Sequence, residues 1–166
     1  MQRLLLTCFL LFGGGCNHVL LPEAGAESEA PGLGIYLVRT GELIIADSDI
    51  LFYDNDFHRI QLTPAGAKKW NSFVLYDNFY QPPIPKLGGL FGEGFCLTLA
   101  GEEIYRGTIW SLVSSRCQSG ILLGDALGAF RDQLWLRLEG NPDQPTFDPR
   151  TDPRLLQFFN QQGKLR

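Results

Sequence analysis

The sequence predicts one α+β domain, in which a mostly antiparallel sheet of about six strands carries two main helices. Three observations lead to this fold class. Short runs of β-branched and aromatic residues are separated by turn-forming residues, only two segments combine a helical pattern with a start signal, and the strands follow one another as hairpins. Residues 35–125 form the main part of the domain, and residues 126–166 add a strand and a helix that complete it.

The first predicted strands are residues 35–38 and 50–53, which are rich in β-branched and aromatic side chains. The second run is followed by Asp54-Asn55-Asp56, whose short polar side chains favour a turn. Residues 58–62 then alternate between apolar and polar side chains, as a strand with one buried face does. The sequence therefore predicts a hairpin over residues 50–62.

Two segments have the start signal and the periodicity of a helix. Thr63-Pro64 begins the first, because threonine caps helices and proline is tolerated in the first turn. Its apolar face should pack on the sheet through Trp70, with Ala67 and Val74 beside it. Asp152-Pro153 begins the second helix, which ends at Gly163 and carries the apolar residues Leu155, Leu156, Phe158 and Phe159.

The remaining strands lie between these helices. Residues 95–99 and 104–110 flank a glycine-bearing turn at 100–103, which is the strongest hairpin signal in the chain. Residues 120–124 and 134–138 supply two further strands. In the last of them Leu134, Leu136 and Leu138 face one way, because successive side chains of a strand point to opposite faces.

Residues 81–94 form a long loop rich in proline and glycine. Long loops in small domains are often functional, so an apolar lip that binds a peptide or a small ligand is one reading, with Leu87, Leu90 and Phe91 as its contact residues. A plain solvent-facing connection is the other reading. A nucleotide site is not expected, because the glycines are not framed by a strand and a helix and no Lys-Ser or Lys-Thr pair follows them.

The first fifteen residues have the anatomy of a cleavable signal peptide. Arg3 gives a positive start, and residues 4–12 are apolar apart from one threonine, a run too short to cross a bilayer of about 30 Å. Gly13-Gly14-Gly15-Cys16 follows and resembles the lipobox of bacterial lipoproteins, although Gly13 stands where that family usually has leucine. The resemblance implies cleavage before Cys16 and a lipid on its thiol. Cleavage at Ala24-Gly25-Ala26 and an uncleaved anchor are the alternatives.

After Cys16, residues 16–34 are predicted to be a lipidated N-terminus followed by a flexible tether, since glycine, proline and acidic residues dominate and offer little to bury. Asn17, rather than aspartate, follows the cysteine, which resembles the lipoprotein pattern that permits export to the outer membrane of a two-membrane bacterium. We therefore expect a protein of the cell envelope, lipid-anchored and, in such a host, on the periplasmic face of the outer membrane.

Charge excludes two classes of partner. The chain has 14 Lys+Arg against 18 Asp+Glu. The leader contains one of these residues, Arg3, so the mature chain has 13 basic residues against 18 acidic ones and a net charge of about −5. Without a basic stripe, neither a nucleic acid nor electrostatic docking to anionic lipid is expected.

The cysteines and histidines indicate which disulfide and which metal site the sequence could form. Cys8 leaves with the leader and Cys16 takes the lipid, so Cys96 and Cys117 remain as a candidate disulfide in an exported protein, or as two small buried side chains. The two histidines, His18 and His58, have no ligand neighbour at metal-site spacing, so no metal is expected. No cofactor is expected either.

An acidic cluster around one histidine is the best candidate for acid–base catalysis. It consists of His58 with Asp47, Asp49, Asp54 and Asp56. Turn formation explains the aspartates without catalysis, and a histidine beside a hairpin is usually exposed and without a role. A calcium loop at residues 54–56 would lack its glycine and its distal glutamate. We therefore do not expect an enzyme.

Three segments in a fixed order resemble a known family. Residues 40–50, residues 60–70 with Leu62-Thr63-Pro64-Ala65-Gly66-Ala67, and residues 97–105 look like the head subdomain of the large periplasmic region of SecD. The resemblance covers roughly residues 36–125. SecD has several transmembrane helices, and here no apolar run is long enough to be one. The resemblance implies an α+β domain that contacts other polypeptides without covalent chemistry.

Together these observations favour a non-enzymatic envelope lipoprotein whose domain binds a protein or a peptide. A lipoprotein that binds a small ligand through the loop at residues 81–94 is the alternative, and an envelope hydrolase is the second. The sequence does not fix the oligomeric state.

Overall fold

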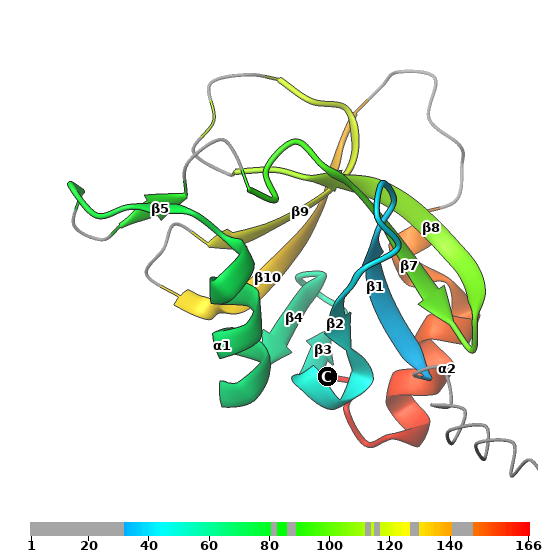
Figure 1. The fold of residues 1–166 in the computed structure, drawn as a ribbon. Helices are drawn as coiled ribbons and strands as arrows, with labels where there is room; N and C mark the ends of the chain where they lie inside the picture. The colour runs from blue at the N-terminus through cyan, green and yellow to red at the C-terminus, as the bar shows by residue number, and fades with distance from the viewer. Residues whose placement is uncertain are drawn as a thin grey trace, which may run out of the picture.

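A computed structural model gives the fold of residues 32–80, 83–85, 89–111, 114, 117–126, 130–140 and 148–166. These residues form a single α+β domain with two helices and a large, mostly antiparallel sheet (Figure 1). The fold class is the predicted one. The sheet, however, has eight strands in the described residues, rather than about six.

The eight strands run in the order β2-β1-β7-β8-β9-β10-β4-β3, and all neighbours are antiparallel except β8 and β9. Their bounds are β1 Leu33–Leu37, β2 Leu43–Ala46, β3 Ile50–Asp54, β4 Arg59–Leu62, β7 Gly94–Leu99, β8 Glu102–Ile109, β9 Gly120–Ala126 and β10 Phe130–Glu139. A separate two-stranded sheet pairs β5 (Tyr76–Asp77) with β6 (Ile84–Pro85). The helices are α1 (Pro64–Phe73) and α2 (Pro153–Gln161), with short 3₁₀ turns η1 (Asp47–Asp49) and η2 (Pro149–Thr151).

One strand of this sheet, β2, was not predicted from the sequence. Its successive residues Ile44 and Ile45 are both fully buried in the one core cluster, because a bulge interrupts the register between the Ile35–Ile45 and Tyr36–Leu43 pairs. A bulged strand whose neighbouring residues are both buried has no alternation of apolar and polar side chains. The four residues of β2 therefore lacked the alternation that identified strands such as residues 58–62 and 134–138.

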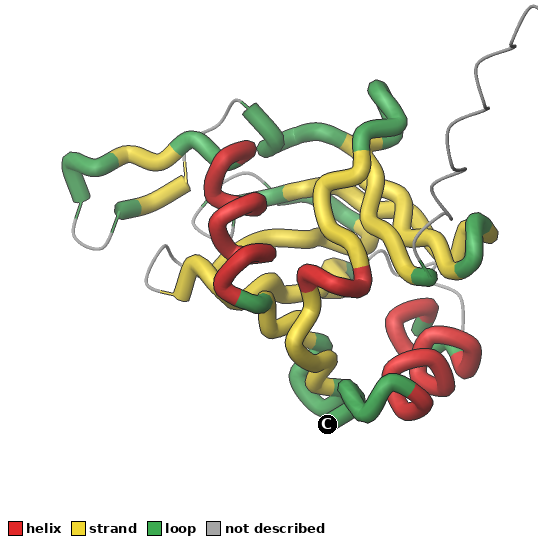
Figure 2. Tube along the Cα trace, turned by 60° about the horizontal axis from the view of Figure 1, so that its bottom comes forward, coloured by secondary structure: helices red, strands yellow, loops and turns green. Residues whose placement is uncertain are grey.

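The sheet curls until its two edges approach each other. β2 and β3 stand at opposite ends of the strand order, yet only the three residues of η1 separate them in the chain. Three residues of 3₁₀ helix span about 6 Å. α1 lies against β2, η1, β4 and β10 and so covers the place where the edges meet (Figure 2).

α1 forms where the sequence predicts it. The Thr63 hydroxyl oxygen accepts the Gly66 N–H at 3.0 Å, and Pro64 is the first helical residue. Trp70 is fully buried under the helix, as expected. A methyl group on Gly66 would stand 2.4 Å from the backbone oxygen of Asp49, so the glycine lets α1 lie directly on η1.

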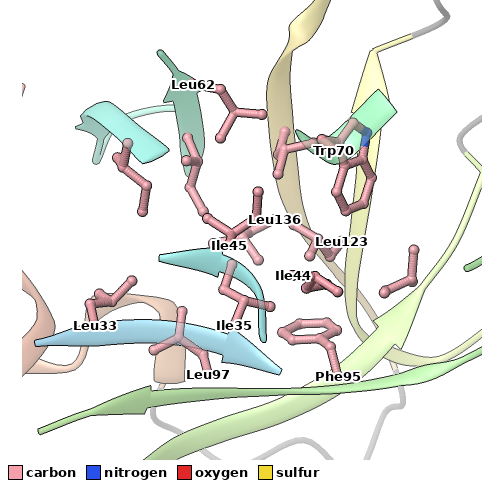
Figure 3. Close-up of a cluster of buried hydrophobic side chains, with 14 of the residues drawn as sticks. Leu33, Ile35, Ile44, Ile45, Leu62, Trp70, Phe95, Leu97, Leu123 and Leu136 are labelled. Atoms are coloured by element: carbon pink, nitrogen blue, oxygen red, sulfur yellow. The ribbon is translucent and has the colours of Figure 1, made fainter. Parts of the chain in front are cut away.

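The core fills the space enclosed by the curled sheet and α1 (Figure 3). It draws on nearly every element: Leu33 and Ile35 from β1, Phe95 and Leu97 from β7, Leu123 from β9, Leu136 from β10 and Trp70 from α1. The predicted alternation in β10 is confirmed at Leu134 and Leu136, whose side chains are almost completely buried.

α2 closes the end of the sheet nearest β3. Its Leu155 and Phe159 are buried, and the Phe159 ring stacks on Tyr53 of β3 with the ring centroids 5.0 Å apart. After α2, the chain runs along the free edge of β3, where the Tyr53 N–H donates to the Lys164 carbonyl and the Arg166 N–H donates to the Tyr53 carbonyl. Among the described helices, none has the length and apolar content that crossing a membrane requires.

Candidate functional site

A groove between α2 and the β7–β8 hairpin is the candidate binding site in the described part of the chain. Its volume is about 490 Å³, within the range of roughly 300–1,000 Å³ found for ligand sites. It is open rather than enclosed. Apolar and polar side chains share its wall, among them Leu99, Ile104 and Phe158 and, around them, Glu102, Arg154, Gln157 and Gln161.

One wall is the side of α2 that borders its buried face. Arg154, Gln157, Phe158 and Gln161 are spaced as residues i, i+3, i+4 and i+7, which places them on one side of a helix. Leu155 follows Arg154 and Phe159 follows Phe158, and both Leu155 and Phe159 are buried. Phe158 is half-buried and packs edge-on against Phe159, with the ring centroids 5.6 Å apart.

The other wall is the tight turn of the β7–β8 hairpin. Ala100 and Gly101 have φ values of 49° and 81°, the left-handed pair that a two-residue hairpin turn requires. The Ala100 N–H donates to the Gly32 carbonyl at 2.7 Å, which ties the turn to the residue before β1. Leu99 and Ile104 flank the turn and are half-buried, so they form the apolar part of this wall.

An ion pair crosses the groove at its rim. The Arg154 guanidinium lies 2.9 Å from an Asp152 carboxylate oxygen on its own helix and 3.6 Å from Glu102 on the hairpin. The hydrogen bond from Arg154 lowers the pKa of Asp152 and raises that of Arg154. Because Arg154 and Glu102 are largely exposed, their pair contributes little stability and can exchange for contacts with a bound molecule.

Of the apolar lip expected at Leu87, Leu90 and Phe91, the two residues that the structure describes are buried. Leu90 and Phe91 are only 3% and 6% exposed and belong to the core, and Leu87 lies outside the described residues. Backbone bonds hold this segment against β8, since the Gly92 N–H donates to the Ile109 carbonyl. A local sequence cannot distinguish apolar residues that form an exposed lip from residues that close a core.

The candidate disulfide between Cys96 and Cys117 is not formed in this structure. Cys96 is half-buried on β7, Cys117 is exposed after β8, and both are free thiols. Burial raises the pKa of the Cys96 thiol. Cys16 lies outside the described residues, so its lipidation stays a prediction.

Turn formation accounts for three of the four aspartates in the acid–base cluster. Asp47 accepts the Ser48 N–H, and Asp49 accepts the Ala46 N–H together with the Lys69 ammonium group. Asp54 accepts the Phe57 N–H and pairs with Arg59 at 2.8 Å. Asp56 is exposed at the β3–β4 turn. These carboxylates do not converge on His58.

His58 is more enclosed than predicted for a histidine beside a hairpin, with 17% of its side chain exposed. The Tyr53 hydroxyl donates to the Arg150 carbonyl at 3.1 Å and also lies 3.0 Å from His58 Nδ1, where the tautomer of the imidazole decides which of the two groups donates. His58 Nε2 faces Asp148 at 3.8 Å. Burial lowers the pKa of His58, and nearby Arg150 adds to this effect.

The groups around His58 serve to attach α2. Arg150 makes three contacts at this junction: it donates to the Leu136 carbonyl at 2.8 Å, pairs with Asp148, and accepts Tyr53 at its own carbonyl. The Arg150 hydrogen bond also lowers the pKa of Asp148. None of these residues lines the groove, so the cluster positions the α2 wall from outside it. This cluster could not be predicted from the sequence, because Asp148 lies 90 residues after His58.

No group of three or more metal-ligating side chains comes together in the parts of the chain that the structure describes. Comparison with known proteins adds no family: no protein-family profile matches the sequence, and no curated protein and no solved structure matches the chain. The resemblance to the SecD head subdomain therefore stays a prediction.

Proposed function

We propose that this chain is a bacterial envelope lipoprotein, anchored through Cys16, whose domain is a non-enzymatic binding module for a protein or peptide. The groove between α2 and the β7–β8 hairpin is the binding site. The observation that carries the proposal is the composition of this groove, in which the apolar Leu99, Ile104 and Phe158 lie beside the charged and amide side chains of the rim.

Such a groove suits an extended polypeptide better than a small ligand. Binding sites for small molecules bury most of the ligand's surface in a concave pocket, whereas this groove is open. Gln157 and Gln161 are exposed, and their amide groups can pair with a peptide backbone while apolar side chains of the peptide cover Phe158. The SecD-like order of segments is consistent with a polypeptide partner, as an argument from analogy.

The rival functions have less support among the described residues. The small-ligand reading depended on an exposed apolar loop, and Leu90 and Phe91 are buried. The hydrolase reading depended on carboxylates oriented around His58, and Asp49 and Asp54 instead bind backbone N–H groups and basic side chains of their own turns.

Site-directed photo-crosslinking in the native envelope tests the groove. A photoreactive residue in place of the exposed Gln157 should give discrete adducts with another polypeptide, and the same residue in place of Glu42, exposed in the β1–β2 turn, should not. Phe158→Asp should remove the adducts at position 157, because a carboxylate cannot enter an apolar contact without losing its hydration. A thermal melt of that variant shows whether the domain still folds. Equal labelling from positions 157 and 42 would contradict the proposal.

Fractionation tests the anchor separately. The wild-type chain should partition with the membrane fraction and extract only into detergent, and Cys16→Ser should leave the mature chain in the soluble fraction. A Cys16→Ser chain that still requires detergent would show that something other than a lipid on this thiol attaches it.

A further inference from the structure

Four side chains fasten η2, and with it the start of α2, to the sheet. They are Tyr53 on β3, His58 in the β3–β4 turn, Asp148 before η2 and Arg150 on η2, and they form the η2 junction. Arg150 Nη1 donates to the Leu136 carbonyl of β10 at 2.8 Å, and the Tyr53 hydroxyl donates to the Arg150 carbonyl at 3.1 Å. α2 begins at Pro153, two residues after the end of η2, so any movement of η2 displaces the first turn of α2.

The Asp148 carboxylate lies between two basic side chains. Arg150 occupies it, because Nη2 donates to Asp148 Oδ2 at 2.6 Å and Nε donates to Oδ1 at 2.9 Å. His58 Nε2 faces the same Oδ2 atom at 3.8 Å, which is too far for a hydrogen bond. A neutral imidazole has one N–H group and an imidazolium has two, so the protonated ring presents an N–H from Nε2 and competes with Arg150 for Asp148.

With His58 neutral, the charges of the junction balance. The charged and titratable groups at the junction, besides His58 itself, are Tyr53 and Asp54 on β3, Arg59 on β4, Asp148 and Arg150 at η2, and Tyr105 on β8. Asp54 pairs with Arg59 at 2.8 Å, just as Asp148 pairs with its own arginine. Burial raises the pKa of both tyrosines, which stay uncharged. A proton on His58 therefore adds a third cation that no anion matches.

The imidazole is held in place while it remains open to solvent. The His58 carbonyl accepts the Leu136 N–H at 2.9 Å, and His58 Nδ1 lies 3.0 Å from the Tyr53 hydroxyl. The φ of His58 is 48°, a left-handed conformation that few residues with a side chain adopt. Because 17% of the side chain is exposed, a proton reaches the ring directly from water. The ring therefore receives the proton in its junction position, beside Arg150.

We propose that His58 makes the η2 junction a pH-sensitive switch, in which a proton on the imidazole loosens η2 and the start of α2 from the sheet. In the closed state Arg150 holds the Asp148 carboxylate and the Leu136 carbonyl together. In the open state His58 and Arg150 are both hydrated and no longer share one carboxylate. The last residues of the chain stay paired with β3, so α2 moves about its C-terminal end.

The proton affinity of His58 agrees with this geometry. Burial and the charge of Arg150 lower the pKa of His58 below its usual 6.5, although Asp148 and Asp54 act in the opposite direction. The open junction therefore binds the proton better than the closed one, and opening is favoured as the pH falls from 6.5 toward the lower pKa of the closed state. At pH 5.5 the equilibrium constant for opening can rise by at most about tenfold, because an imidazole with a pKa of 6.5 is then about ten times more protonated than neutral.

The switch is a property of the junction, and only its effect on binding rests on the proposed function. The first turn of α2 carries Arg154, on the rim of the groove, and the following turns carry Gln157, Phe158 and Gln161. When η2 is loose, this wall no longer keeps a fixed distance from the β7–β8 turn. The groove should therefore bind its polypeptide more weakly in acid than at neutral pH.

Hydrogen exchange followed by mass spectrometry tests the switch on the whole mature chain, residues 16–166 carrying Cys16→Ser, at about pH 7.5 and 5.5 with the intrinsic exchange rate at each pH divided out. The protection of the α2 amides should fall by up to about tenfold at the lower pH and stay below that of β7, because α2 opens without unfolding the sheet. His58→Asn should remove this pH dependence, since asparagine tolerates a left-handed backbone and does not titrate. His18→Gln, which changes the other histidine of the chain, is the matched control and should behave as the wild type.

Proton NMR measures the titration of His58 directly. In the His18→Gln chain the imidazole signals come from His58 alone. Their midpoint should lie below pH 6.5, and the backbone signals of α2 should change with the same midpoint. This measurement leaves His58 in place, so it tests the switch even if His58→Asn does not fold.

Three results would overturn the inference: a His58 pKa at or above 6.5, α2 protection equal to that of β7 at both pH values, or a pH dependence that persists in His58→Asn. Photo-crosslinking at position 157 separates the switch from the proposed function. If α2 opens in acid but position 157 gives no adducts at either pH, the switch stands and the proposed function fails. If adducts form equally at both pH values and α2 does not open, the proposed function stands and the switch fails.

Discussion

Gly107 in the middle of β8 lets three strands approach closely, and Gly107→Ala tests this packing. It pairs with Phe95 of β7, whose fully buried ring lies over it. A methyl group at position 107 would stand 2.5 Å from that ring and 2.3 Å from the Ile121 carbonyl oxygen of β9. Both distances are shorter than real Cβ contacts, and neither neighbour is the free end of a flexible side chain.

The change in the free energy of unfolding of Gly107→Ala is the difference between two opposed effects. Alanine would gain roughly 0.5–1 kcal/mol over glycine in a strand, whereas overpacking a filled core costs about 1–3 kcal/mol and sometimes more. The backbone oxygen of Ile121 can move only if β9 moves away from β8, and these strands share two register pairs, Thr108 with Leu122 and Ile109 with Leu123. We therefore expect Gly107→Ala to lower the free energy of unfolding by about 1–3 kcal/mol.

Urea and thermal denaturation followed by circular dichroism measure this effect. For a domain of this size the expected loss lowers Tm by about 3–6 °C per kcal/mol. Gly140→Ala is the matched control, because nothing lies within 4 Å of its added methyl group, and it should be neutral or slightly stabilising. A Gly107→Ala chain as stable as Gly140→Ala would refute the packing described for β7, β8 and β9.

Three further substitutions test the helix start, the buried loop and the junction at His58. Thr63→Ala should lower the free energy of unfolding by about 0.5–2 kcal/mol in urea, because it removes the acceptor of the Gly66 N–H, and an unchanged midpoint would contradict this cap. Leu90→Ala should cost about 2–5 kcal/mol by leaving a cavity, whereas a residue of an exposed lip would cost almost nothing. His58 has a pKa below its usual 6.5 in the folded state, so the unfolded state takes up a proton first as the pH falls and stability decreases between pH 6.5 and the lower folded pKa. His58→Gln should flatten this part of the stability profile, and an unchanged slope would mean that another group causes it.

The elements that the sequence predicted are those with a local physical signal. Thr63-Pro64 and Asp152-Pro153 cap their helices with their own side chains and begin them with proline. The turn at Ala100-Gly101 requires a left-handed backbone, which glycine adopts readily, so the glycine predicted the turn. In β10 one face is buried, so Leu134 and Leu136 alternate with Trp135 and Arg137.

The features that the sequence did not predict depend on contacts between distant segments. The groove joins residues 99–104 to residues 154–161, and neither segment alone shows that the other will lie opposite it. One signal was present, because Leu156 and Phe158 flank the buried Leu155 and Phe159, so the apolar stripe of α2 is wider than the part of it that is fully buried. An apolar stripe that is wider than the face it buries indicates a second contact surface.

The attachments of α2 explain why the groove is formed before anything binds to it. Before the helix, Arg150 and Tyr53 tie η2 to β10 and β3, and after it the backbone of residues 164–166 pairs with β3. Because the helix is fixed at both ends, its outer face keeps a constant distance from the β7–β8 turn, and a partner need not supply the free energy of ordering that wall. A change at Arg150, which does not line the groove, should therefore weaken binding by loosening α2. Arg150→Lys keeps the charge but loses the planar fork that reaches Leu136 and Asp148 together, so weaker crosslinking at position 157 without unfolding would show that α2 must be held in place for the groove to bind.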